Sequence, residues 1–322
     1  MRKDPAGDKK SFVLTTQPAV RPGIRICDRI GQDYNVYVWK TQSSSTAQGI
    51  AVIRALETEK SEGERICYDP FARKFVDGGS YLLHKAFAEY IERRSPGFIG
   101  FIVARCRYID DYLEACLDEG TTQVVILGAG LDSRAYRFEA FQGGARVFEV
   151  DQPATQAAKI KRVKKFFGEV PGHVGYVPID FNEETLDKLA SYGYKRTLRT
   201  LFIWEGVIAY LKPEAIDTTL AWVRTNSEPG SAILFDTMDA SALTGKNLRQ
   251  EVKIGRLTQR FTGEALAFGI DKDQTVEFMT QRGFTGVGYA WAEDFRRLYF
   301  TGVNQDRPVA DIYSIVHAAV AG

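Results

Sequence analysis

The residues with the clearest chemical role are Gly128, Ala129 and Gly130, which follow four consecutive apolar residues, Val124–Leu127. Three of these four are β-branched, and such a run is typical of a strand buried on both faces of a parallel sheet. Glycines let the backbone approach a ligand closely because they carry no Cβ. The residues after the turn, Leu131–Arg137, are compatible with a helix. A strand, a glycine turn and a helix N-terminus together predict a nucleotide-cofactor site in a Rossmann-like sheet.

A carboxylate at the end of the next apolar run narrows the choice of cofactor. Asp151 closes the strand expected over 145–150, where it can accept hydrogen bonds from two ribose hydroxyls. NAD and S-adenosylmethionine share this requirement. The alternative role for Asp151 is to cap the helix beyond Pro153. The dinucleotide fingerprint also needs a third glycine, and Ser133 stands at that position, which argues against NAD.

Two further strand ends separate the two cofactors. The third apolar run ends in Asp180 and Phe181, where an acid would hold an adenine amino group beside an aromatic ring, and the fourth ends in Glu205. Open α/β sheets bind ligands at the carboxyl ends of their strands. These positions favour S-adenosylmethionine, since an NAD(P)-dependent oxidoreductase leaves Asp180 and Glu205 without a task. The alternatives are that Asp180 caps a helix near 183–189 and that Glu205 is a buried acid paired with an arginine.

Five ordered motifs resemble the leucine carboxyl methyltransferase family. Within it, they resemble a bacterial and fungal branch that acts on small molecules and includes polyketide O-methyltransferases. The resemblance extends from about Thr46 to the C-terminus. The motifs are Tyr68–Ala72, Ala104–Asp111, Gly128–Arg137, Phe148–Pro153 and Trp204–Leu211.

The resemblance implies roles for single residues. It makes S-adenosylmethionine the methyl donor, with Gln152 and Glu205 among its contacts. Arg105 would clamp the methionine carboxylate, a two-pronged task suited to a guanidinium group. The alternative for Arg105 is a cation on a helix surface. Arg134 and Arg137 are expected to be structural. The lysine that protein-directed members carry early in the cap has no equivalent here.

Composition excludes several classes of function. The 322 residues include 42 Lys and Arg against 41 Asp and Glu, a formal net charge of +1, so no basic face for nucleic acid is indicated. The four cysteines have no CxxC spacing and no histidines clustered near them, which predicts reduced thiols and no metal site. No apolar run approaches membrane-spanning length, and the polar N-terminus lacks a signal-peptide core. We therefore expect a cytoplasmic protein that binds neither nucleic acid nor a membrane.

The chain is expected to have three parts: an N-terminal segment of uncertain order (1–45), a helical cap (46–118) and an S-adenosylmethionine-binding core (119–322). An insertion at about 240–270 is a candidate lid. The core should adopt the α/β class I methyltransferase fold, a Rossmann-like seven-stranded sheet that ends in a hairpin. The basic run Lys159–Lys165 is expected on the solvated face of a helix. The expected strands are 123–127, 145–150, 174–178, 200–204, 231–236, 284–290 and 311–320.

The acceptor site is less clearly marked. Tyr34 and Tyr37 could form an aromatic wall, although packing of the N-terminal segment is the stronger interpretation. Tyr210 matches a family position near the cleft, and its alternative is a place in the core. None of these residues is a candidate catalyst, so the catalytic residues are left unassigned.

The scarcity of bases indicates the mechanism. The three histidines, His84, His173 and His317, are each isolated in the sequence, and each is expected to be structural or on the surface. A carboxylate acceptor is already ionised at neutral pH and needs no base, whereas an alcohol usually does. We therefore expect an O-methyltransferase for a small-molecule acceptor, preferably a carboxylate. Methylation of a protein C-terminus is the alternative within the family, and a phenol is the alternative small acceptor.

Overall fold

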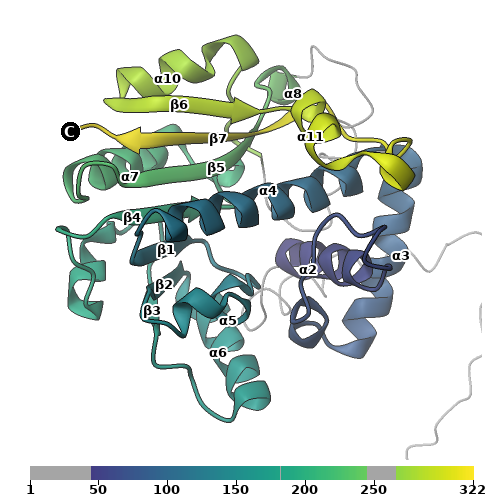
Figure 1. Cartoon of the computed structure of the whole chain (residues 1–322), viewed down its shortest axis with the longest axis horizontal. Helices are drawn as coiled ribbons and strands as arrows, with labels where there is room; N and C mark the ends of the chain where they lie inside the picture. Colours follow the sequence, from purple (N-terminus) through teal and green to yellow (C-terminus); the bar gives the residue numbers. More distant parts are fainter. Residues whose placement is uncertain (1–44, 182, 245–265) are drawn as a thin grey trace, which may run out of the picture. The chain divides into compact units, whose positions relative to one another are not determined.

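The computed structural model describes residues 45–181, 183–244 and 266–322 (Figure 1). Tyr34 and Tyr37, with the rest of the expected N-terminal segment up to residue 44, lie outside the described residues. Most of the expected lid, residues 245–265, also lies outside them. The expectations for these two segments therefore stay predictions.

Seven strands form one mixed sheet in the order β3-β2-β1-β4-β5-β7-β6. The first five strands pair in parallel, and β7 lies antiparallel between β5 and β6. This order is that of the class I methyltransferase fold, and it confirms the predicted fold class. The strands are β1 Gln123–Leu127, β2 Arg146–Asp151, β3 Val174–Pro178, β4 Thr200–Trp204, β5 Ala232–Met238, β6 Phe284–Ala290 and β7 Tyr313–Val320.

Alternate side chains of the central strand β1 enter two different parts of the core. Val124 and Ile126 join a cluster that includes Ile109 of helix α4, while Val125 and Leu127 join a second cluster that includes Leu220 of helix α7. All five residues of β1 are buried. Both faces of the sheet are therefore covered, which explains why its central strands are almost continuously apolar.

Helices lie on both faces of the sheet and beyond its carboxyl-terminal end. In Figure 1, α4 runs beside the sheet, and α2 and α3 lie past the ends of the parallel strands. These three helices precede β1, as expected for the cap. The α-helices of four or more residues are α2 Ser45–Thr58, α3 Gly78–Arg94, α4 Phe98–Asp118, α5 Arg134–Arg137, α6 Pro153–Phe167, α7 Pro213–Thr225, α8 Ser241–Thr244, α10 Thr275–Gln281 and α11 Ala292–Tyr299.

Three expectations need correction. The helix after the glycine turn is a single short element, α5, which begins at Arg134 and not at Leu131. The last two strands are antiparallel but do not form a tight hairpin, because α11 lies in the chain between them. Lys159 is not on the solvated face of α6: it is 1% exposed and pairs with the buried Glu149. Sequence periodicity missed this pair because it placed Lys159 in a solvated basic run and gave no partner for Glu149 in the strand expected over 145–150.

Candidate functional site

One cavity of about 700 Å³ lies at the carboxyl ends of the parallel strands. It is lined by the glycine turn, the ends of β2, β4 and β5, and side chains from α2, α3 and α4. The structure thus brings all nine of the sequence-predicted cofactor residues to a single wall, together with Tyr210. The nine are Arg105, Gly128, Ala129, Gly130, Asp151, Gln152, Asp180, Phe181 and Glu205.

The glycine turn has a conformation that requires glycine. Gly128 and Gly130 have φ values of 68° and 42°, in the left-handed region that other residues rarely adopt. A Cβ on Gly128 would lie 2.2 Å from Cγ2 of Val207, so the loop after β4 packs directly on the turn. The backbone N–H groups of Gly128 and Ala129 both donate to the carbonyl of Val150, at 2.7 and 3.0 Å. The turn is therefore held against the end of β2.

Asp151 holds the same turn from the end of β2. Its carboxylate accepts hydrogen bonds from the backbone N–H of Gly130 and, at 2.7 Å, from that of Gln152. Helix α6 begins after Gln152, which makes no side-chain capping bond. The geometry thus favours an acid that organises the cavity wall over one that caps α6.

Asp180 and Phe181 follow β3 at the same edge. The carbonyl of Asp180 accepts hydrogen bonds from the N–H groups of Glu183 and Glu184, which makes a turn and not a helix. The nearby 3₁₀ helix begins only at Leu186, and its cap is Thr185. The alternative that Asp180 caps a helix is therefore wrong. The ring centroid of Phe181 lies 6.2 Å from that of Trp204, at the end of β4.

Arg105 crosses from α4 to two carboxylates on the sheet. Its Nε lies 3.0 Å from Oε1 of Glu205, and its Nη1 donates to Oδ2 of Asp236 at 2.5 Å. Asp236 also accepts the backbone N–H of Gly206 at 2.6 Å. Arg105 is 4% exposed, so the alternative of a helix-surface cation is wrong. Within the described part of the chain, Nε is the buried atom of Arg105 that has no hydrogen-bond partner, although it lies close to Glu205.

Sequence analysis did not identify Asp236 as a site residue. It lines the cavity near the end of β5 and pairs with Arg105. The signal was present, because Asp236 ends the apolar run Ile233–Phe235 as Asp151 ends the run before it. The strand-end rule that selected Asp151 would have selected Asp236 as well.

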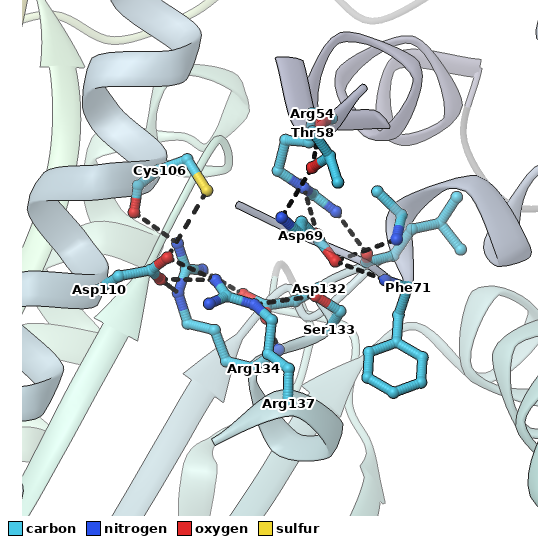
Figure 2. A network of polar contacts seen from close by, with 12 residues as sticks. Arg54, Thr58, Asp69, Phe71, Cys106, Asp110, Asp132, Ser133, Arg134 and Arg137 are labelled. Carbon is cyan, nitrogen blue, oxygen red and sulfur yellow. Dashed lines mark hydrogen bonds and ion pairs between the residues drawn. The ribbon is translucent and has the colours of Figure 1, made fainter. Parts of the chain in front are cut away.

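A network of arginines and carboxylates connects the cap, the turn after β1 and the cavity-lining Asp132 and Glu205 (Figure 2). Arg134 forms ion pairs with Asp110 of α4, with Asp132 of the turn after β1 and with Glu205 after β4. Arg137 pairs with the same Asp110. Neither arginine lines the cavity, in agreement with the structural role expected for them. The network joins the cap to the sheet through buried charges.

A second branch of the network starts on α2. Arg54 pairs with Asp69 at 2.9 Å and donates to the carbonyl of Leu131 at 2.7 Å. The carboxylate of Asp69 in turn accepts the backbone N–H groups of Phe71 and Ala72. The cap is therefore bonded directly to the residue that follows the glycine turn (Figure 2).

These contacts determine the ionisation of Glu205. Burial disfavours its charge, but the guanidinium groups of Arg134 and Arg105 outweigh burial and hold the pKa of Glu205 well below its usual value. Conversely, the neighbouring carboxylates raise the pKa of Arg105 despite its burial. Glu205 is thus ionised near neutral pH and unsuitable as a general base. It is also a buried acid paired with arginines, as its alternative interpretation expected.

One part of the cavity wall is mostly apolar. It comes from α2, α3 and the start of α4, with Tyr313 of β7. One histidine, His84, also lines it, whereas His173 donates from its Nε2 to the Ala135 carbonyl and His317 packs on Tyr112. The apolar side chains of this wall are Ile50, Leu83, Phe87, Ile91, Phe98 and Phe101.

His84 has defined partners on both ring nitrogens. Its Nδ1 lies 2.8 Å from the carbonyl of Ser80, which can only accept, so this nitrogen carries the proton. Nε2 then holds the free lone pair and accepts from the hydroxyl of Ser45 at 3.2 Å. Sequence analysis expected a structural or surface histidine, and the structure places it in the cavity wall.

Comparison with known proteins assigns this chain to a family. The family model described as leucine carboxyl methyltransferase matches residues 47–224. The chain belongs to this family. The match confirms the predicted family and covers the cap, the glycine turn and the ends of β2, β3 and β4.

Relatives with the same class of name are found among bacteria. A Streptomyces coelicolor protein is 34% identical over 58% of this chain and 66% of its own length. A Mycobacterium avium protein is 31% identical over 82% of this chain and 95% of its own length. Both are provisionally named S-adenosyl-L-methionine-dependent methyltransferases. The S-adenosylmethionine cofactor predicted for this chain is that of its relatives.

Solved structures confirm the fold. A protein from Thermobifida fusca, provisionally named a methyltransferase, matches with a TM-score of 0.57 and 15% identity, over 87% of this chain and 96% of its own. A DUF574 family protein from Streptomyces avermitilis matches with a TM-score of 0.56 and 12% identity, over 86% and 97%. At such low identity the likeness extends to the fold alone.

Proposed function

We propose that this member of the leucine carboxyl methyltransferase family is an O-methyltransferase that transfers the methyl group of S-adenosylmethionine to a small-molecule acceptor, preferably to a carboxylate. The observation that carries the proposal is the convergence on one cavity of nine residues, which were selected from the strand ends and from the family resemblance. A second part of that cavity is apolar and lies against the cap. The donor and the acceptor would therefore share one chamber.

The donor fits the polar wall. Asp151 is half-buried and would accept the two ribose hydroxyls, while Asp180 and Phe181 would hold the adenine. The guanidinium group of Arg105, which lines the cavity, would bind the methionine carboxylate. Glu205 and Asp236 occupy the other sides of that guanidinium group, so a two-pronged clamp requires one of them to yield. We therefore assign Arg105 a single strong contact to the donor.

A carboxylate acceptor suits the apolar wall. The donor supplies a methyl group on a positively charged sulfur; the acceptor oxygen forms the new O–C bond with its own lone pair, and the C–S electrons return to sulfur. Opposite charges are neutralised in this step, so a water-poor chamber accelerates it without proton transfer. The chain's task is then to hold the three reacting atoms in line, which is worth several powers of ten in rate.

His84 gives the phenol alternative a specific basis. Its Nε2 carries a lone pair at the cavity wall, and the Ser45 hydroxyl that donates to it could be replaced by a phenol. A phenol must lose its proton to attack, and a histidine is the side chain suited to accept it near neutral pH. We rank this second because the Nε2 lone pair already has a partner.

Two further predictions concern the protein in the cell. The described cysteines Cys67, Cys106 and Cys116 are free thiols, which supports a reducing compartment and a cytoplasmic location. Among the described residues, no helix combines the length and the apolar character needed to cross a bilayer. No cluster of three metal-binding side chains occurs among them either.

Two experiments test the proposal. In thermal-shift measurements S-adenosylhomocysteine should raise the melting temperature, and NADH should leave it unchanged. A panel of carboxylic acids and phenols is then screened with isotopically labelled methyl donor. Stabilisation by NADH alone would refute the cofactor, and label appearing only on nitrogen or carbon would refute O-methylation.

The pH dependence separates the two acceptor classes. Single-turnover methyl transfer to a carboxylate should be flat between pH 5.5 and 8, in the parent and in His84→Asn alike. A rate that rises through the range in which imidazole loses its proton, with the rise abolished in His84→Asn, would favour the phenol. His173→Asn, which alters a histidine outside the cavity wall, is the matched control.

A further inference from the structure

A lysine and a glutamate are buried together beneath the glycine turn. Lys159 of α6 and Glu149 of β2 are 1% and 0% exposed, and Nζ lies 2.8 Å from Oε2. Lys161 and Lys164 of the same helix are exposed. Burial of an ion pair is costly and adds little net stability compared with an apolar pair of similar volume. The contacts of the pair therefore indicate what it does besides stabilising the fold.

The lysine touches the turn itself. Its Nζ donates to the carbonyl of Ala129 at 3.3 Å. That carbonyl and the N–H of Gly130 belong to one peptide group, and in a trans peptide they point to opposite sides. The N–H of Gly130 donates to Asp151 on the cavity side. One peptide group is thus held at both ends, by Lys159 from the buried side and by Asp151 from the cavity side.

Local sterics do not enforce this orientation. Gly130 has no Cβ, and glycine adopts positive and negative φ values with similar ease. A flip of the Ala129–Gly130 peptide would turn a carbonyl oxygen toward Asp151 and the donor. The carbonyl oxygen of Ala129 and the carboxylate of Asp151, both negative, would then face each other in the donor site. A buried cation that bonds the carbonyl removes this alternative.

We propose that Lys159, held in place by Glu149, is a positioning residue for the donor: it fixes the Ala129–Gly130 peptide so that its N–H faces Asp151. The inference rests on the donor site proposed above. Lys159 touches neither the donor nor the acceptor, so its effect should appear in donor affinity. The methyl-transfer step with saturating donor should be nearly unchanged.

The surroundings make the pair act as one unit. The Nζ of Lys159 lies 5.6 Å from the ring centroid of Tyr136. The Tyr136 hydroxyl shares a 2.7 Å hydrogen bond with the hydroxyl of Tyr176, and Tyr176 is the residue of β3 paired with Glu149 in the sheet. Burial raises the pKa of Glu149 to about 7 even though Lys159 opposes the rise. A variant that removes Lys159 alone would leave Glu149 without a partner, so the test must change both residues.

The test compares two variants in which the ion pair is absent. Glu149→Gln removes the ion pair but keeps a side-chain oxygen that can accept from Lys159, so Lys159 should keep its place and its bond to Ala129. Glu149→Gln with Lys159→Met removes that bond as well. S-adenosylhomocysteine affinity, measured by calorimetry, should stay within about threefold of the parent in the single variant and fall about tenfold or more in the double variant, the loss of one hydrogen bond from a charged donor. KM for the donor should rise while kcat stays within about twofold.

The outcomes are separable. Equal affinity in the single and double variants would overturn the proposal, because a purely structural pair affects both alike. If the double variant does not fold, Lys159→Met with Glu149→Met, an apolar pair, takes its place with the same expectation. Lys161→Met controls for the loss of a lysine from α6. If Asp151→Ala also leaves affinity unchanged, the donor site itself is wrongly placed; if Asp151→Ala weakens binding and the double variant does not, only the role of Lys159 fails.

Discussion

Replacement of Asp151 by alanine tests the donor site most directly. In the structure its two oxygens each accept one backbone N–H, from Gly130 and from Gln152. An ionised carboxylate has about four lone-pair positions, and bound ribose hydroxyls would donate to these oxygens. Each hydrogen bond to a charged group contributes about 1.5–3 kcal/mol. Asp151 is only half-buried, so water recovers part of that, and we expect a loss of about 2–4 kcal/mol in total.

The assay is calorimetric titration with S-adenosylhomocysteine. A loss of about 2–4 kcal/mol corresponds to a Kd about 30- to 1000-fold higher, since about 1.4 kcal/mol is tenfold. Asp151→Asn keeps one acceptor oxygen and should fall between the parent and the alanine variant. Asp217→Ala, which removes an exposed carboxylate paired with Arg282, is the control. An alanine variant that binds within about threefold of the parent would refute the reasoning.

The other predictions concern charged residues around the cavity. Arg105→Lys keeps the charge but loses the planar donor geometry, so donor affinity should fall about tenfold; an unchanged Kd contradicts the assignment. Glu205→Gln breaks two buried ion pairs and should lower the free energy of unfolding at pH 7 by about 3–5 kcal/mol in denaturant titrations. Because the pKa of Glu205 is lowered on folding, its contribution is present above pH 4.5 and should be lost as the pH falls below that. The pKa of Glu149 is raised from 4.5 to about 7, so the folded chain keeps a proton that the unfolded chain releases. Parent stability should therefore decline by about 3 kcal/mol relative to Glu149→Gln with Lys159→Met as pH rises from 4.5 to 7; parallel pH curves would show that the shift is absent.

The positions of the site residues were predictable because the topology gathers them. Apolar runs such as Val124–Leu127 identify parallel strands, and parallel strands bring their carboxyl ends to one edge. Asp151, Asp180 and Glu205 each follow such a run, so their meeting at one cavity needed no knowledge of side-chain packing.

The pairing of charges was not predictable in the same way. Arg134 meets Glu205 across 71 positions of sequence, and Arg105 meets Asp236 across 131. Periodicity describes only neighbours within a helix or strand, so it could not choose partners at such separations. Lys159 is an example. A lysine-rich helix predicts exposure to solvent, yet this side chain points inward, where it forms an ion pair with the buried Glu149.

The arginine network also has an evolutionary consequence. Because Arg134 pairs with three carboxylates from three separate segments, its replacement by a neutral residue leaves three buried carboxylates with one cation fewer. We therefore expect tolerated substitutions at Arg134 to occur together with substitutions of these carboxylates. Apolar residues of the cavity wall such as Leu83 and Ile91 carry no charge, so their exchange alters the shape of the cavity without leaving a buried charge unpaired. In proteins with this fold, we therefore expect single substitutions in the apolar wall to change the acceptor. The charged residues around the proposed donor site should change more slowly.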